Sequence, residues 1–430
     1  MQDSNFNKLK YYLVLLLMFS AGTLLAQNTD SETTIKVNDS TKSGDLLKQI
    51  GNGFFPTKLW NFDLRYLIKY NQYEGFRTGL GGITNDSFSE KYRIDSYLVY
   101  GFRDDSFKYK IGGGFRVNKD TKTWINLSYI DDLKETGSSA FLTDSRSFSF
   151  FEPRLLNINL FHKHITSAIS IEHEITPNLY SKSELAISNI RPTYDYNFLL
   201  DGTNYSGFET TTAKVSLQWD PFKTFEESKA GVKTAIDGYP KFTLQYTKSF
   251  KDLLNADFNF SKLDFRTIHK IKHNRNSYTV GTLSAGITHG NAPLTHLYHA
   301  YPNNITKETI LQRFSVAGIN SFETMYFNEF FSDRFSTLVL KHYVKPFAIA
   351  KHFNPQLVLV SRYAIGNMNN IDRHQNVSFG TLKHGYTESG FEINKLIFGF
   401  GLSATYRYGA YHLPREEDNI ALKFTFNITL

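Results

Sequence analysis

The sequence predicts an all-β protein: a transmembrane antiparallel β-barrel of about sixteen strands, with fourteen strands as the alternative count. The last twelve residues alternate apolar and polar side chains without an error. Similar alternating segments, separated by turn residues, recur along the chain. Aromatic residues make up 16% of the chain, with 26 Tyr and 38 Phe, as expected where rings lie at both interfaces of a lipid layer. The mean hydropathy of −0.35 fits too, because half of each barrel strand faces a polar lumen.

The terminal segment 419–430 (NIALKFTFNITL) is the clearest strand. Its apolar face is followed by no later element that could cover it, so we expect lipid to cover it. Tilted across a bilayer, the segment is long enough to span it. We expect this strand to carry the signal by which the outer-membrane barrel assembly machinery, an expected partner, receives the chain. The residues of that signal are Phe424, Phe426, Ile428 and Leu430.

The amino-terminal part predicts export. Lys8 and Lys10 precede an apolar run at 11–19 and a cleavage point after Ala26, which is the pattern of a signal peptide. Residues 27–53 are polar and without periodicity, and we interpret them as a flexible periplasmic leader. Residues 54–430 then form the barrel. An exported chain without a spanning helix but with lipid-facing strands is expected in the outer membrane.

The other predicted strands follow from period-two alternation and turn signals. An even number of strands returns both ends of the barrel to the periplasmic side. The alternation is weakest at 150–161. The predicted strands are 75–85, 91–103, 107–117, 124–131, 150–161, 165–175, 179–189, 212–219, 241–247, 258–272, 278–288, 333–344, 356–366, 388–397, 398–411 and the terminal segment.

Composition narrows the function. The absence of cysteine excludes a disulfide framework and a zinc-thiolate site. The net charge of +7 is explained by basic groups facing lipid headgroups, as is the run HKIKHNR at 269–275, so no nucleic-acid partner is expected. His162 and His164 share a strand face near His173, which suggests either a metal site or a polar rim, and we favour the rim. No cofactor or metal is predicted, and without a local catalytic motif the chain is not expected to be an enzyme.

A long segment, 290–332, separates two predicted strands, and we expect it to fold into the lumen. From Arg313 the chain reads RFSVAGINSFETMYFNEFFSDRF. With its apolar-Gly step at 316–318 and its Asn-Ser-Phe at 320–322, it resembles the sixth extracellular loop of BamA/TamA-like barrels, the "bacterial surface antigen" superfamily that inserts or secretes proteins at the outer membrane. In that superfamily the loop tip carries an Arg-Gly pair. Here Glu323 and Thr324 stand in those places, so the loop needs a basic partner rather than an acidic one.

The candidate site residues follow from this resemblance. Glu74 and Arg77 are candidates for wall partners of the loop. They are an odd number of residues apart, so their side chains point to opposite faces of a regular strand, and both can face the lumen only if a β-bulge lies between them. The loop and following-strand candidates are Asn320, Ser321, Phe322, Glu323, Glu329, Asp333 and Arg334.

A closer resemblance covers nearly the whole barrel. The stretches NQYEGFRTGLGG at 71–82, MYFNEFFSDR at 325–334 and YRYGAY at 406–411 resemble an uncharacterised family of outer-membrane barrels. Many members carry a carboxypeptidase-regulatory-like domain before the barrel. This resemblance implies a fold and a location but no chemistry.

Three functions stay open at this point. The first is protein or lipid assembly or translocation at the outer membrane by a BamA/TamA-like barrel, which we favour. The second is a passive pore or small-solute channel with a basic lumen, and the third is a hydrolase in the barrel wall. In each case we expect a monomer in contact with outer-membrane lipid.

Overall fold

The computed structural model describes residues 53–144, 154, 158–227, 233–273, 276–349, 353–397 and 399–426. Regular structure among them consists of β-strands and short 3₁₀ helices, so the predicted all-β class is confirmed. No helix in this part of the chain has both the length and the apolar character needed to cross a membrane. The predicted signal peptide and leader lie outside the described residues, except for Gly53.

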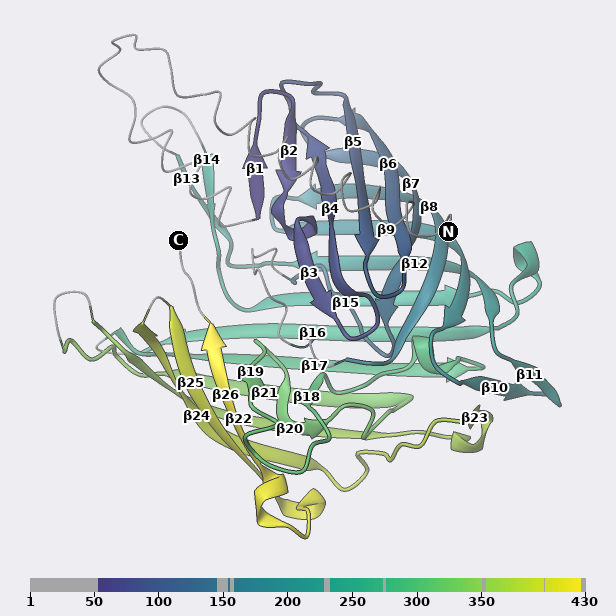
Figure 1. Ribbon diagram of the computed structural model, residues 1–430. Coiled ribbons are helices and arrows are strands. Elements are labelled where there is room, and N and C mark those ends of the chain that lie inside the picture. The colour runs from purple at the N-terminus through teal and green to yellow at the C-terminus, as the bar shows by residue number, and fades with distance from the viewer. Residues whose placement is uncertain are drawn as a thin grey trace, which may run out of the picture. The chain divides into compact units, whose positions relative to one another are not determined.

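The main sheet is antiparallel apart from one short pairing at its edge, and most of its strands pair with their neighbours in chain order (Figure 1). We call its long members the wall strands. They are β2 (Trp60–Asp63), β3 (Ile68–Asn71), β4 (Gly75–Thr84), β5 (Tyr92–Gly101), β6 (Ser106–Asn118), β7 (Thr123–Glu135), β8 (Phe161–Thr176), β9 (Leu179–Pro192), β12 (Phe208–Trp219), β15 (Lys241–Ser249), β16 (Phe260–Lys272), β17 (Tyr278–Gly290), β21 (Arg334–Tyr343), β22 (Gln356–Asn367), β24 (Tyr386–Ile397), β25 (Phe400–Tyr408) and β26 (Ile420–Phe426).

Shorter elements occupy the connections. Two of these, β1 and β19, join the main sheet at its ends. The short strands are β1 (Phe54–Pro56), β10 (Asn197–Leu200), β11 (Thr203–Tyr205), β13 (Thr224–Glu227), β14 (Lys233–Ile236), β18 (Pro302–Asn304), β19 (Ser315–Val316), β20 (Phe322–Tyr326) and β23 (His374–Gln375). The 3₁₀ helices are η1 (Leu64–Tyr66), η3 (Leu253–Asn255), η5 (Leu294–His296), η6 (Ile371–Arg373), η7 (Gly409–Tyr411) and η8 (Glu416–Asn419).

The main sheet has 19 strands in the described part of the chain. Both β2 and β3 pair with β4, at its two ends, so together they form one interrupted wall strand. Counted in this way, and without the short edge strands β1 and β19, the wall has sixteen members, as the sequence predicts. Fifteen of the sixteen predicted strands correspond to wall strands, and one does not.

The predicted strand at 150–161 is wrong where the structure describes it. Arg154 and residues 158–160 are not in a strand, and β8 begins only at Phe161; the remainder of that segment lies outside the described residues. The wall strand missed by the prediction is β2 with β3. Its alternation is broken by η1, whose first turn is capped by the Asp63 carboxylate accepting from the Arg65 N–H at 3.1 Å. The interruption hides the period-two signal.

The connections differ in length between the two ends of the wall strands. We call the end that carries residues 136–160, 193–207, 291–333, 368–385 and 409–419 the loop end, and the other the turn end. The turn end has short connections such as 119–122 and 177–178, and also the β13–β14 hairpin. The long segment 291–333 connects the eleventh and twelfth wall strands, β17 and β21.

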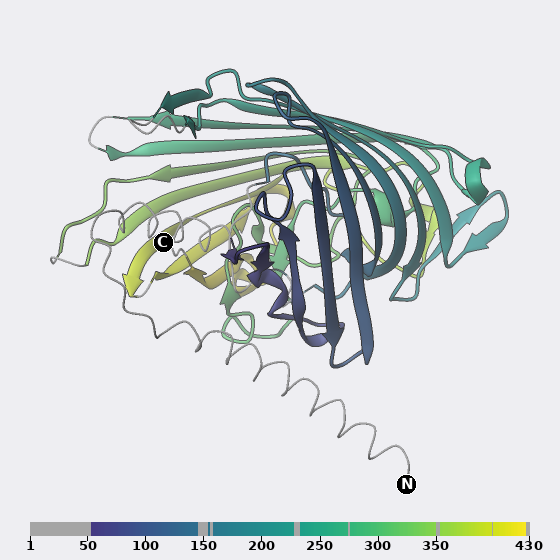
Figure 2. The same cartoon turned by 90° about the horizontal axis from the view of Figure 1, so that it is seen from above.

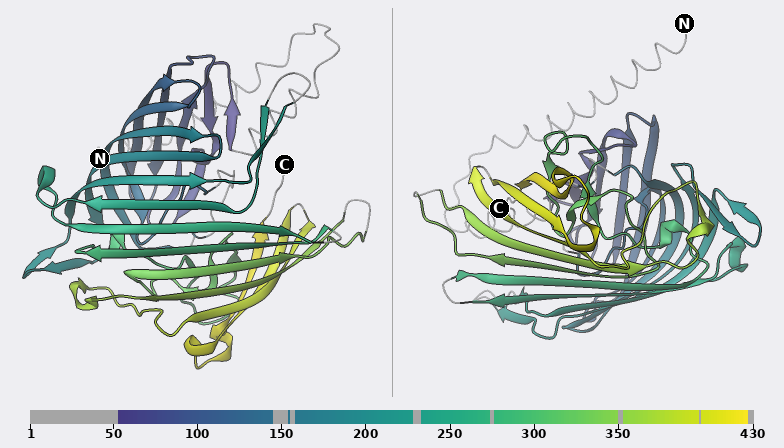
Figure 3. Two further views of the ribbon diagram at one scale, coloured as in Figure 1. Left: turned by 180° about the vertical axis from the view of Figure 1, so that it is seen from behind. Right: turned by 90° about the horizontal axis from the view of Figure 1, so that it is seen from below.

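The sheet curves around this long segment, which we call the docked loop (residues 291–333; Figures 2 and 3). His299 Nε2 lies 2.7 Å from a carboxylate oxygen of Glu135 at the end of β7. Tyr298 stacks on Phe335 of β21, with ring centroids 4.5 Å apart, and Lys423 of β26 pairs with Glu323. A single loop therefore touches wall strands from β7 to β26 on one face of the sheet, and the predicted folding of this loop into the interior is observed.

The opposite face of the sheet is apolar and exposed. Each wall strand from β4 to β26 contributes at least one large apolar side chain to it, and these residues follow one another across neighbouring strands. On β26, Leu422 and Phe424 are 38% and 42% exposed, whereas Ala421, Lys423 and Thr425 are buried. One member from each strand is Leu80, Leu98, Ile111, Leu127, Ile169, Leu185, Val215, Leu244, Leu263, Ile287, Leu340, Leu359, Phe391, Leu402 and Leu422.

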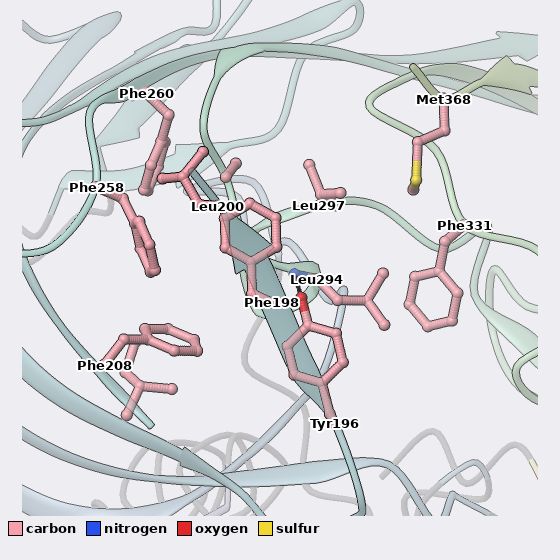
Figure 4. Close-up of a cluster of buried hydrophobic side chains, with 12 residues drawn as sticks. Tyr196, Phe198, Leu200, Phe208, Phe258, Phe260, Leu294, Leu297, Phe331 and Met368 are labelled. Atoms are coloured by element: carbon pink, nitrogen blue, oxygen red, sulfur yellow. Dashed lines mark hydrogen bonds between the residues drawn. The ribbon is translucent and has the colours of Figure 1, made fainter. Parts of the chain in front are cut away.

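Apolar packing is concentrated at the loop end instead of inside the sheet. Figure 4 shows Phe198 of β10 among side chains from several loops and strand ends. The Phe258 ring meets those of Phe198, Tyr205 and Phe208 edge to face, at 5.0–5.3 Å. The Tyr196 hydroxyl accepts a hydrogen bond from the Leu294 N–H at 2.9 Å, which ties the docked loop to this cluster. The loop end is thus covered by a packed cap.

Candidate functional site

The docked loop enters the interior through a parallel pair of short strands, β18 and β20. Side chains of this pair are almost entirely buried: Asn303, Glu323 and Thr324 are 0% exposed and Asn304 is 1% exposed. Polar groups so deeply buried must find partners, since an unpaired buried polar group costs free energy. The partners of this loop tip are charged residues on the last wall strands.

Glu323 at the loop tip accepts three hydrogen bonds from its own loop. They come from Asn303 Nδ2 at 2.8 Å, the Gly318 N–H at 3.1 Å and Ser321 Oγ at 2.7 Å. Lys423 of β26 completes the site, with its Nζ 3.0 Å from a Glu323 oxygen, and it also donates to the Asn303 carbonyl. The terminal wall strand therefore provides the basic partner that the sequence requires for Glu323.

A second carboxylate reaches in the opposite direction, from the wall to the loop backbone. Glu388 of β24 accepts the N–H groups of Glu323 and Thr324 at 2.8 and 2.9 Å. Arg362 of β22 donates to Glu388 at 2.9 Å, and its other terminal nitrogen lies 4.0 Å from Glu323. Arg362 thus lies between a loop carboxylate and a wall carboxylate. Because these hydrogen bonds go to backbone atoms, they fix the position of the loop tip as well as its charge.

Electrostatics favour the ionised form of Glu323. Burial by itself would raise the pKa of this carboxyl group, but the positive charges of Lys423 and Arg362, with the hydrogen bond from Ser321, lower it below its usual value. We call these residues the docking network: Asn303, Glu323, Thr324, Arg362, Glu388 and Lys423.

A third contact holds the loop near the loop end. Glu329 binds Arg407 of β25 through both oxygens, at 2.7 and 3.1 Å, and it also accepts the Tyr326 N–H at 3.0 Å. The Arg407 guanidinium lies over the Tyr386 ring, 4.7 Å from its centroid. This bidentate pair closes the turn that follows β20.

The docked loop also covers the edge of the last wall strand. Strand β19 pairs in parallel with β26, Ser315 opposite Lys423 and Val316 opposite Phe424. The Ala317 N–H donates to the Phe424 carbonyl at 2.7 Å. Nearby, Arg313 donates to Asp418 at 3.0 Å. The free edge of β26 is therefore occupied by a segment of its own chain.

The first wall strand is not at that edge. Strands β2 and β3 pair with β4, and β1 pairs with β2. Within the described residues, no strand pairing joins β26 to β1, β2 or β3. We call the boundary between β26 and these three strands the seam.

The comparisons with known proteins agree with this architecture. A family model described as the C-terminal domain of a family of unknown function, DUF5686, matches residues 55–380. The chain belongs to this family. The resemblance to an uncharacterised barrel family is thereby confirmed, and no curated protein sequence matches this DUF5686 chain.

BamA and CdiB are among the solved structures that resemble the DUF5686 chain. BamA from Haemophilus ducreyi lacking POTRA domains 1–3 has a TM-score of 0.50 and 10% identity, and the match covers 94% of this chain and 80% of that chain. CdiB from Acinetobacter baumannii has a TM-score of 0.41 and 9% identity, with coverage of 83% and 57%. The likeness to BamA shows a shared fold.

The remaining loop candidates of the DUF5686 chain have different environments. Phe322 is buried and packs edge to face on Tyr386 at 5.6 Å, whereas Asn320 is exposed. Asp333 and Arg334 bond each other at 3.2 Å just where β21 begins, and both also bond Asn369. This pair fixes the exit of the loop rather than its tip. Of the carboxyl-terminal signal residues, Ile428 and Leu430 lie outside the described residues.

Glu74 and Arg77 are not partners of the docked loop, and that prediction is wrong. Arg77 forms a bidentate pair with Asp132 of β7 at 2.6 and 2.8 Å. Glu74 binds Lys108 at 2.9 Å and also contacts Asn71 and Arg77. The turn between β3 and β4, with Gly75 at φ +67°, brings both side chains to the same neighbourhood despite their different parities. They brace the first wall strands.

Sequence reasoning missed four members of the loop contacts: Arg362, Glu388, Arg407 and Lys423. Each lies at an inward position of its strand, where a charged side chain interrupts smaller or apolar neighbours. That signal marks them as lumen residues, but only the pairing register decides which of them meet. No group of three or more His, Cys, Asp or Glu that could hold a metal ion occurs among the described residues.

Proposed function

We propose that this protein is an outer-membrane β-barrel that acts at its seam, in the assembly or translocation of protein at the outer membrane. The band of exposed apolar side chains supports the membrane location, because such a band is stable only when covered by lipid. Outer-membrane lipid is thus one partner. The barrel assembly machinery is a second, and the barrel acts as a monomer.

The observation that carries the proposed role is the edge of β26. In the part of the chain that the structure describes, this edge pairs with β19 of the docked loop and not with the first wall strand. A sheet edge held by a two-residue strand can be released at low cost, since two bridging residues contribute only a few hydrogen bonds. Release of β19 would expose a template for an entering strand.

The docked loop argues against a passive open pore as the main function. The side chains of its tip are 0–1% exposed and fill the interior beside β22–β26. Buried ion pairs of the docking network, Arg362–Glu388 and Lys423–Glu323, hold the tip in place. Conduction through this region would require the docking network to break.

Locking the edge tests the proposal. The chain has no cysteine, so the double variant V316C/F424C places a disulfide only between facing residues of β19 and β26. We expect the oxidised variant to reproduce the changes in outer-membrane protein content of a deletion strain, and reduction to restore the parental content. The matched control is L338C/Y363C, which links facing residues of two permanently paired strands, β21 and β22. Full complementation by oxidised V316C/F424C would contradict a role for the seam.

A further inference from the structure

A second group of charged residues lies in the interior, away from the docking network. It consists of lysines on the inward face of three wall strands: Lys134 on β7, Lys214 on β12 and Lys262 on β16. The register places Lys214 and Lys262 on either side of Thr247 in the same row of the sheet. With adjacent strands about 4.8 Å apart, the two backbones lie roughly 10 Å from each other. Lys134 lies near the end of β7, opposite His162 of β8, and interacts electrostatically with both of these lysines.

No carboxylate lies within ion-pair distance of these lysines in the described part of the chain, although Glu184 and Asp264 are in the same region. Within the described residues, none of the three side-chain amines makes a hydrogen bond, and none has an ion-pair partner within 4.0 Å. The Lys262 amine lies over the Tyr298 ring, 4.3 Å from its centroid. Lys262 is only 9% exposed, whereas Lys134 faces the interior but keeps access to solvent there. A buried amine such as that of Lys262, with no carboxylate in direct contact, is costly.

The groups are close enough to act on one another. Lys134 interacts electrostatically with both other lysines and with Glu184 and Asp264. Lys182 also belongs to this region but lies 3.7 Å from Glu184. Four lysines against two carboxylates leave two positive charges, with the histidines counted as neutral.

The docked loop borders this region. Its Tyr298 ring contacts Lys262, and His296 in η5 also interacts electrostatically with Lys262 and Lys134. Burial first, and then the positive charges of Lys262 and Lys134, lower its pKa to about 3, so it is neutral at physiological pH. It adds no positive charge but can donate a hydrogen bond. Two inward-facing histidines on β8, His162 and His164, stand beside Lys134.

There is space for a ligand beside Lys214. A cavity of about 180 Å³ is lined by Lys182, Glu184, Lys214, Ser216 and Gln245, and on its other side by residues 140–142. That segment is held in place by a hydrogen bond from Gln245 Nε2 to the Ala140 carbonyl, at 2.9 Å. The cavity is large enough for a small oxyanion and several water molecules.

We propose that Lys134, Lys214 and Lys262 form a binding site for a small, multiply charged phosphate-type anion inside the barrel. Inward-facing amines, imidazoles and hydroxyl groups suit phosphate oxygens, which accept several hydrogen bonds and carry more than one negative charge. The phosphate could belong to a soluble anion or to a lipid headgroup. This site is separate from the seam and does not depend on the proposed function.

Calorimetric titration of the full-length protein in zwitterionic detergent with inorganic pyrophosphate tests the site. We expect saturable binding that weakens as salt is added, because the attraction is between charges. The variant K134Q/K262Q should lose affinity at least tenfold. The control K119Q/K122Q removes two exposed lysines from the turn at 119–122 and should bind as the parent does.

A second arm separates the two sources of phosphate. The same titration with short-chain phosphatidic acid shows whether a lipid phosphomonoester reaches the site, and binding of either probe with the same lysine dependence supports the proposal. Folding is checked by thermal melting without anion: K134Q/K262Q should melt no lower than the parent, since it loses like-charge repulsion. The proposal is overturned if neither probe binds saturably, or if both double variants lose affinity equally.

Discussion

Removing the Lys423 amine should release the docked loop. In K423M, Glu323 keeps its loop hydrogen bonds but loses its closest cation, leaving Arg362 at 4.0 Å. Removing one partner of a buried ion pair costs roughly 3–5 kcal/mol. Because 1.36 kcal/mol corresponds to a tenfold change in an equilibrium constant, the ratio of undocked to docked protein should rise by about two to nearly four orders of magnitude.

The lack of native cysteine provides the assay. Met325 is 0% exposed at the loop tip, so a cysteine in M325C reacts with a membrane-impermeant maleimide only when the loop undocks. Its labelling rate should follow the undocked population, and K423M should raise it at least a hundredfold. The control K119M removes an exposed lysine and should leave the rate unchanged. A K423M rate within threefold of the parent would refute the reasoning.

Two extensions use the same reporter. In E323Q/K423M both charges are gone, so labelling should be slower than in K423M, because replacing a whole buried pair is often nearly neutral. For pH the sign follows from Glu323: its pKa is lowered in the docked state, so its contribution is complete above the ordinary glutamate value of about 4.3 and is lost as pH falls through the lowered pKa. The labelling rate relative to that of a fully exposed cysteine at the same pH, a reference that corrects for the loss of thiolate, should rise only below about pH 4.3, and E323Q should remove that rise.

Two further predictions concern the wall. In G286A the new Cβ would lie 2.6 Å from the buried Tyr298 ring, so we expect the free energy of unfolding to fall by about 1–3 kcal/mol and proteolysis of the docked loop to become faster. The control G281A places its Cβ only against the flexible end of the Leu340 side chain and should be tolerated. Equal melting temperatures of the two variants would contradict this prediction. In L127R an arginine replaces a 62%-exposed leucine of the apolar band and should destabilise the barrel in lipid by roughly 2–4 kcal/mol. The control L311R changes an exposed loop residue and should not destabilise it. Denaturant unfolding in lipid vesicles measures both effects.

For the charged contacts of the docked loop, the amino-acid sequence indicates the loop residue but not its partner on the wall strands. Glu323 was identified, and its need for a cation was deduced from its charge and its place at the loop tip. Which cation meets it could not be deduced, because Lys423 lies a hundred residues further along the chain and Arg362 lies three strands away from Lys423 in the sheet. The interpretation of Glu74 and Arg77 as loop partners fails for the same reason. An odd or even position along a strand indicates which face of the sheet a side chain occupies, but not which residue it contacts.

The amino-acid sequence by itself determined the strands, their lipid and lumen faces and the existence of a long inserted loop, because period-two alternation is a local property and the pleat places successive side chains on opposite faces. Only the tertiary structure decided that β2 and β3 are one interrupted strand, that β19 occupies the edge of β26, and that Lys214 and Lys262 face the interior on either side of Thr247. Those features depend on strand register and sheet curvature, which bring together residues whose separation along the chain carries no information about their distance in space.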